Sequence, residues 1–89
     1  MQKEFKVKTI TQLKKAQGMI SKVIEMAEND RYCIDLLQQS LAAMGLLKGA
    51  NKLILENHLN SCFKTGMQTT SGKRQKELIK EVIQVISKV

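Results

Sequence analysis

Cys33, His58 and Cys62 are the side chains in this 89-residue sequence best suited to binding a metal ion together. His58 and Cys62 are four residues apart, so in an α-helix both lie on one face, with Cβ atoms about 5–6 Å apart. Two thiolates and one imidazole make a soft ligand set, and thiolates select Cu(I) or zinc among the common metals. Structural zinc has four protein ligands, but the nearest carboxylates, Asp35 and Glu56, face other sides of the helix. The three-ligand set therefore favours Cu(I).

The separation of these residues along the chain indicates a site between two chains. Cys33 lies 25 residues before His58, which is about 37 Å along one continuous helix. Two such helices packed antiparallel place Cys33 of one chain opposite His58 and Cys62 of the other, and twofold symmetry gives two identical sites. The midpoint falls near Met44 to Lys48. Two glycines one turn apart lie there and either allow close approach of the helices or merely weaken them.

The elements that position the ligands are predicted to be helices. The sequence has no proline, and it is rich in good helix formers such as Leu, Lys, Glu, Gln, Met and Ala. Thr9 and Gln12 have the spacing of a capping box, and apolar residues recur at helical spacing after them. We expect a single domain over residues 1–89. Its predicted parts are a basic flexible arm at 1–8 and helices at about 9–28, 31–65 and 71–88.

The central helix is the unusual element. At about 35 residues it would be roughly 50 Å long. Its apolar residues cover more than one face, and a helix that is apolar on so much of its circumference needs neighbours that a single chain does not supply. The length and the patterning therefore predict an all-α protomer that assembles into oligomers.

The charge balance points to a polyanionic partner. The net charge is +7, and thirteen of the fifteen cationic residues are lysine. Such an excess suits nucleic acid, although it also serves solubility alone. The site residues have ordinary alternatives too, because free cysteines are usually small buried apolar side chains and single histidines are often surface or core residues.

Other classes of protein are disfavoured by what the sequence lacks. Three aromatic residues leave little for base stacking, and no segment combines a cationic face with aromatic membrane anchors. No apolar run forms a signal peptide or a membrane span, so we expect a cytoplasmic protein with reduced thiols and no membrane partner. There is no paired acid and base and no phosphate loop, so we expect no enzymatic activity.

Two segments carry a family resemblance. They are Arg31-Tyr32-Cys33-Ile34-Asp35 and Asn57-His58-Leu59-Asn60-Ser61-Cys62-Phe63. Together they closely resemble the CsoR/RcnR/FrmR family of bacterial metal-sensing repressors, and the likeness extends from about Leu13 to Val85. Nickel and cobalt sensors of the family look different, with a further N-terminal histidine and a histidine at the position of Cys62. The Cys, His, Cys pattern resembles the copper-sensing branch, with Cys33, His58 and Cys62 as ligands.

The resemblance implies a fold and an assembly. It implies a three-helix protomer with a long central helix, an antiparallel dimer forming a four-helix bundle, and a tetramer made of two dimers. It also implies two residues around the liganding histidine. Tyr32 matches a tyrosine that hydrogen-bonds nearby, and Glu77 matches a glutamate on the last helix that engages the free ring nitrogen. A liganding histidine normally donates its other N–H to such a group.

The resemblance further implies double-stranded operator DNA as the partner, bound by basic residues of the first two helices. The candidates are Lys14, Lys15, Lys22, Lys48 and Lys52. Gln12 and Gly49 stand where relatives often have arginine. Because lysine meets phosphate as a point charge, we expect recognition weighted toward the DNA backbone and its shape.

The predicted function is that of a copper(I)-responsive repressor. The metal-free form binds its operator, and Cu(I) binding releases it and derepresses copper-resistance genes. Two alternatives use the same chain. One is a thiol- or persulfide-sensing repressor that reacts through Cys33 and Cys62, and the other is a copper-buffering protein without DNA activity.

Overall fold

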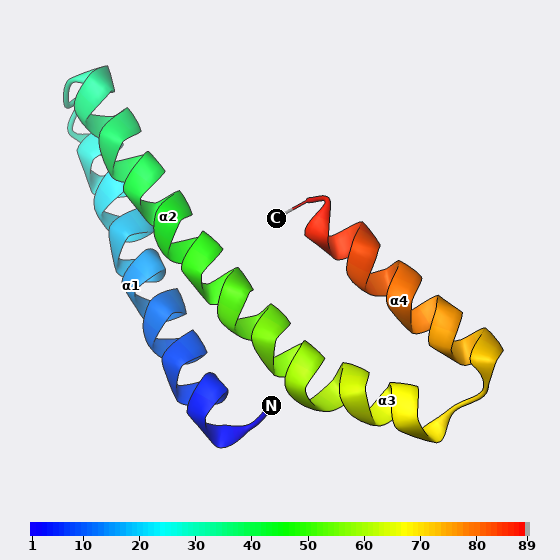
Figure 1. The fold of residues 1–89 in the computed structure, drawn as a ribbon. Coiled ribbons are helices and arrows are strands. Elements are labelled where there is room, and N and C mark those ends of the chain that lie inside the picture. The colour runs from blue at the N-terminus through cyan, green and yellow to red at the C-terminus, as the bar shows by residue number, and fades with distance from the viewer. Residues whose placement is uncertain (89) are drawn as a thin grey trace.

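The structure is a computed structural model that describes residues 1–88, and over that range it consists of helices, the turns that join them and two residues at each end. The elements are α1 (Lys3–Glu28), α2 (Cys33–Asn57), the π-helix η1 (His58–Phe63), α3 (Lys64–Thr69) and α4 (Gly72–Ile86). The middle three follow one another without a break and form one long rod (Figure 1). The predicted all-α fold with a long central helix is therefore confirmed.

The start of α1 differs from the prediction. The helix begins at Lys3, so most of the expected flexible arm at 1–8 is helical and Thr9 is buried within the helix instead of capping it. Two contacts explain the earlier start. Phe5 is half-buried, and the backbone N–H of Gln2 donates a hydrogen bond of 2.8 Å to Oδ1 of Asn57. The first turn is thus held by a residue more than fifty positions away, which local spacing cannot predict.

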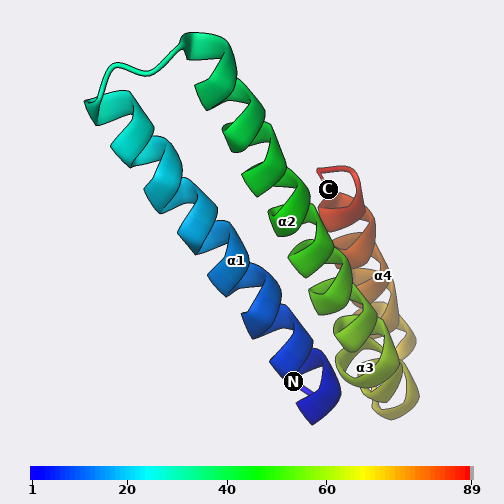
Figure 2. The same ribbon diagram turned by 90° about the vertical axis from the view of Figure 1, so that its left-hand side faces the viewer.

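The first two helices form an antiparallel hairpin (Figure 2). α1 ends at Glu28, close to the predicted polar junction, and Asp30 turns the chain with a φ of 52°. The backbone N–H of Arg31 donates to the Met26 carbonyl at 3.0 Å, a bond that satisfies one of the helix's last free carbonyls. Small residues allow the two helices to approach closely, since Ala16 and Ala50 are almost fully buried between them.

Very little of the apolar surface is buried in one chain. The buried apolar residues are Ala16, Met26, Ala43, Ala50 and Leu78. Many large apolar side chains on the same helices remain exposed, including Leu37, Leu41, Met44, Leu47 and Ile54. The chain is also long and thin, with extents of 56 × 26 × 14 Å. Exposed apolar surface of this extent marks an interaction face. We therefore expect another protein chain to cover these side chains.

The last helix turns back beside α2 on the side away from α1 (Figure 1). Its start is fixed by contacts with α3. A Cβ at Gly66 would lie 2.8 Å from Cδ1 of Leu78, so this glycine leaves room for the one buried side chain of α4. Nε2 of Gln75 also donates to the Met67 carbonyl at 2.6 Å, and Oγ1 of Thr70 donates to the Gly66 carbonyl at 2.8 Å. Beyond this joint, Ile79, Ile83 and Ile86 are largely exposed.

Candidate metal centre and basic surface

Cys33 and Tyr32 lie at the start of the central rod. Cys33 is the first residue of α2, and its thiol is exposed and free. Tyr32 precedes it as the N-cap residue and is 69% exposed. The thiol and the phenol are therefore both accessible from outside the chain.

His58 and Cys62 lie at the other end of α2, within the π-helix η1. His58 is half-buried and Cys62 is exposed. The sequence predicts a regular α-helix here, but π-helical turns interrupt α-helices frequently at functional sites. A local competitor accompanies the interruption, because Oγ of Ser61 donates to the Asn57 carbonyl at 2.7 Å. In an α-helix that carbonyl accepts the backbone N–H of Ser61, so the hydroxyl competes for the same acceptor.

One chain does not bring the three predicted ligands together. Within residues 1–88, no group of three Cys, His, Asp or Glu side chains is close enough to hold a metal ion. The 25 residues between Cys33 and His58 place them about 37 Å apart along the rod. They nevertheless share one face, because Cys33, Met44 and His58 are separated by nearly whole numbers of turns. That face is the exposed apolar one, and Met44 is 50% exposed.

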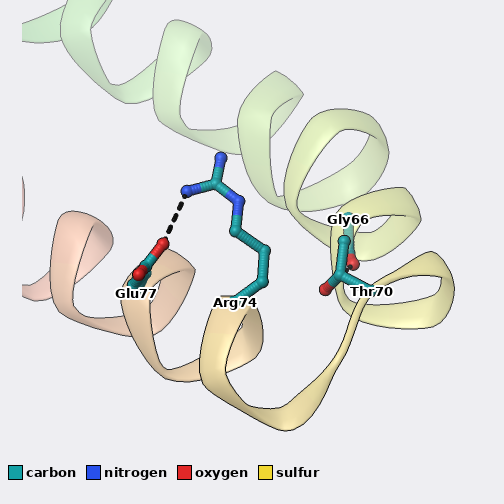
Figure 3. A network of polar contacts seen from close by, with 4 residues as sticks. All are labelled: Gly66, Thr70, Arg74 and Glu77. Carbon is teal, nitrogen blue, oxygen red and sulfur yellow. Dashed lines mark hydrogen bonds and ion pairs between the residues drawn. The ribbon is translucent and has the colours of Figure 1, made fainter.

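A cavity of about 420 Å³ lies beside His58, between α2 and α4. Its lining residues are Asn51, Ile54, Leu55, His58, Glu81, Val82, Val85 and Lys88. Glu81 is thus the carboxylate of α4 that shares a cavity with the histidine. The predicted candidate, Glu77, lies outside this lining and accepts a hydrogen bond from Nη1 of Arg74 at 3.2 Å (Figure 3). Because the two glutamates are four residues apart on one face of α4, helical spacing alone does not distinguish them.

The five predicted DNA-contacting lysines are all exposed, but they do not form a single patch. Lys15 and Lys22 are two turns apart on α1 and lie in line with Lys8. Lys14 lines a shallow cavity with Leu47, whereas Lys8 lines another with Gln12 and Leu53. Leu47 and Leu53 face different sides of α2. Lys14 therefore borders one side of the hairpin, and Lys8 borders the other. Lys48 and Lys52 lie on α2, and among residues 1–88 the single ion pair, Arg74 with Glu77, involves none of them.

Gln12 and Gly49, the two positions at which the family resemblance led us to expect arginine, lie against each other. A Cβ at Gly49 would be 2.6 Å from Nε2 of Gln12. A larger side chain at position 49 therefore requires the half-buried Gln12 side chain to move. Gln12 and Gly49 are therefore direct neighbours at the seam between α1 and α2.

No helix within residues 1–88 is both long enough and apolar enough to cross a lipid bilayer.

Fold and side-chain chemistry together describe a small all-α protein whose candidate soft metal ligands lie far apart along one chain. Residues 6–88 match the protein family described as "Metal-sensitive transcriptional repressor". The chain belongs to this family of metal-sensitive transcriptional repressors, which confirms the resemblance seen in the sequence and the prediction that the protein is not an enzyme.

Named relatives come from several bacteria. The chain is similar to the copper-sensing transcriptional repressor CsoR of Mycobacterium tuberculosis (strain ATCC 25618 / H37Rv), with 34% identity over 76 residues, or 82% of this chain and 64% of the relative. CsoR of Bacillus subtilis (strain 168) is 32% identical over 76 residues, covering 85% of this chain and 72% of the relative. The chain thus spans somewhat less than two thirds of the mycobacterial relative's length.

A solved structure has the same fold. The crystal structure of the copper-sensing repressor CsoR with Cu(I) from Geobacillus thermodenitrificans NG80-2 superposes with a TM-score of 0.82 at 28% sequence identity. The match covers 99% of this chain and 88% of the other. The two proteins therefore share their helical fold over nearly the whole of this chain.

Proposed function

We propose that this protein is a cytoplasmic copper(I)-responsive repressor, which binds operator DNA without metal and leaves it when Cu(I) binds, so that copper-resistance genes are derepressed. The observation that carries the proposal is the split ligand set on one exposed apolar face of α2. Cys33 stands at one end of that face and His58 at the other, with Cys62 one turn beyond. The copper-sensing repressors of Mycobacterium tuberculosis and Bacillus subtilis to which the chain is similar support the choice of metal.

The spacing along α2 supports an antiparallel dimer as the sensing unit. A twofold axis that pairs Cys33 with His58 of a second copy also pairs Leu37 with Ile54 and Met44 with Leu47. These four apolar side chains are between 37% and 55% exposed in the single chain. Pairing the two faces would bury them and complete two identical sites. Two such dimers would then form the tetramer that the family resemblance implies.

In this dimer Cys33 of one copy and His58 and Cys62 of the other would hold the metal. Thiolate and imidazole donors fit Cu(I), which when bound supplies a strong link between two chains that otherwise meet through apolar contacts. The free ring nitrogen of His58 would be oriented by a hydrogen bond, as in most metal-ligating histidines. Tyr32 and one glutamate of α4 are the candidates, and the cavity beside His58 favours Glu81 over Glu77.

Replacement of these two glutamates tests which one engages His58. We expect Glu81→Gln to reduce the effect of Cu(I) on DNA affinity about 10-fold or more, since losing a hydrogen-bonded partner of a metal ligand typically costs 10–100-fold. Glu77→Gln is the matched control, because it removes the same charge four residues away and should change the effect by less than about twofold. Fluorescence anisotropy of labelled operator DNA, measured with and without Cu(I), gives both values. If Glu77→Gln alone is impaired, Glu77 is the partner of His58.

The DNA partner is supported by charge. Four copies of a chain with a net charge of +7 carry ample positive charge for phosphate contacts, and such binding weakens steeply with salt. We propose that Lys14, Lys15, Lys22, Lys48 and Lys52 contribute these contacts. In the tetramer, lysines on both sides of each hairpin can belong to surfaces formed by more than one chain.

The central experiment measures operator affinity in a Cu(I) titration under anaerobic conditions, with DNA from upstream of the protein's own gene. We expect one Cu(I) per chain and a loss of affinity within the 5–150-fold range typical of allosteric coupling. Linkage requires that bound operator weaken Cu(I) binding by the same factor. Zn(II) serves as the comparison metal. An operator affinity that stays constant through the titration would refute the proposal, and absence of DNA binding would favour a copper buffer.

A persulfide-sensing repressor is the second candidate, because both thiols are exposed and free. In that case a polysulfide would convert one of the thiols of Cys33 and Cys62 to a persulfide, and the other thiol would attack it across the dimer interface to form a disulfide and release sulfide. Mass spectrometry after polysulfide treatment distinguishes the two functions. Rapid crosslinking between chains that releases DNA, together with no response to Cu(I), would support the persulfide function.

A further inference from the structure

A single hydrogen bond joins α1 to the rod that carries the metal ligands. It runs from the backbone N–H of Gln2 to Oδ1 of Asn57, at 2.8 Å. Within residues 1–88, every other hydrogen bond made by a side chain joins residues at most eight positions apart, such as the Gln75 to Met67 bond. Asn57 immediately precedes His58 and is only 4% exposed. This buried amide is therefore a specific tie between the start of α1 and the ligand segment.

The hydrogen bond between Gln2 and Asn57 fixes the start of α1 against α2. Burying an amide without a hydrogen bond costs free energy. The bond from Gln2 offsets this cost for the Asn57 side chain between α1 and α2. The start of α1 also lacks a side-chain cap of its own, and an oxygen acceptor from α2 partly fills that role. This bond therefore defines how the first turn of α1 sits against α2.

Asn57 is also bonded to the ligand segment itself. Its backbone carbonyl accepts the hydroxyl of Ser61 at 2.7 Å, and Ser61 lies beside Cys62. A change in helical register between His58 and Cys62 would shift this carbonyl and with it the side chain of Asn57. The first two turns of α1, which carry Lys3, Lys6 and Lys8, would then lose or change their hold on α2.

We propose that Asn57 is a positioning residue that transmits occupancy of the ligand segment to the basic first turns of α1. This inference rests on the proposed function and adds its route. With the Gln2 bond intact, Lys3, Lys6 and Lys8 are held in one place relative to the rest of the hairpin. Occupancy of His58 and Cys62 alters the helix at Asn57, releases Gln2, and so lowers the affinity of this basic segment for DNA.

The test compares three substitutions in the full-length protein. Asn57→Leu removes the acceptor, and we expect it to leave Cu(I) affinity within about threefold of wild type while reducing the Cu(I)-induced loss of DNA affinity about 10-fold, within the usual range of coupling. Asn57→Asp keeps an acceptor for the Gln2 N–H and places negative charge at a helix start, where it is favourable. This variant should therefore keep the coupling that Asn57→Leu loses. Gln68→Leu, at an exposed amide of α3 outside the ligand segment, is the matched control and should behave as wild type.

A second measurement covers the case in which Asn57→Leu does not fold. Hydrogen exchange of the wild-type protein should show faster exchange in the first turns of α1 when Cu(I) is added, including the Lys6 amide that bonds to the Gln2 carbonyl. Unchanged exchange there, or full Cu(I)-induced release of DNA by Asn57→Leu, would overturn the inference. Failure of the wild-type protein to release DNA with Cu(I) would instead contradict the proposed function.

Discussion

Two defective variants of this protein are expected to restore half of the metal sites when they are combined in one dimer. Cys33→Ala removes one thiolate from each site, and the double variant His58→Ala/Cys62→Ala removes the other two ligands. Each protein alone should bind Cu(I) more than about 100-fold more weakly, since even loss of a partner to a ligand costs 10–100-fold. In a mixed dimer, however, Cys33 of the double variant meets His58 and Cys62 of the single variant. One complete site per dimer is the expected result.

The measurement uses coexpressed chains with two different affinity tags, purified over both tags and titrated with Cu(I) in competition with a chelator. A dimer of two differently tagged Cys33→Ala chains is the control and should show no tight site. Tight binding of half an equivalent per chain in the mixed dimer supports a site between chains. No recovery in the mixed dimer, or tight binding by Cys33→Ala alone, would contradict it.

Charge placed on the exposed apolar face of α2 is expected to prevent assembly. In the proposed antiparallel dimer Met44 would pack near the twofold axis, so Met44→Glu would bring two carboxylates into one apolar interface. An unpaired charge in such a place costs several kcal/mol. For a domain of this size each kcal/mol corresponds to about 4–8 °C in Tm, so we expect a loss of more than about 10 °C and a shift toward the monomer.

Gln38→Glu is the matched control for this substitution. It adds the same charge to an exposed position of α2 on a different side of the helix from Met44, and we expect no change in mass and little change in Tm. Light scattering after size-exclusion chromatography measures the assembly, and circular dichroism measures the melting. If Met44→Glu keeps the wild-type mass and Tm, the interface lies on another face of the protein.

Much of the protein's architecture follows from local sequence. Helix-forming composition without proline determines that the chain is all-α, and the end of α1 at Glu28 follows from the polar junction beside Asp30. The separation of Cys33 from His58 follows from helix length alone, because a rise of about 1.5 Å per residue cannot be shortened. For the same reason, the expectation that a second chain completes the ligand set follows from the spacing of these residues in the sequence.

The tertiary structure decided what depends on contacts between distant residues. The start of α1 is held against α2 by the hydrogen bond from Gln2 to Asn57, which spans fifty-five positions. Glu81, and not Glu77, lines a cavity with His58, and which of the two does so depends on how α4 is rotated relative to α2. Periodicity reports which face of a helix is apolar, but it carries no information about the rotation of one helix against another, and that rotation determines which side chains meet the ligands.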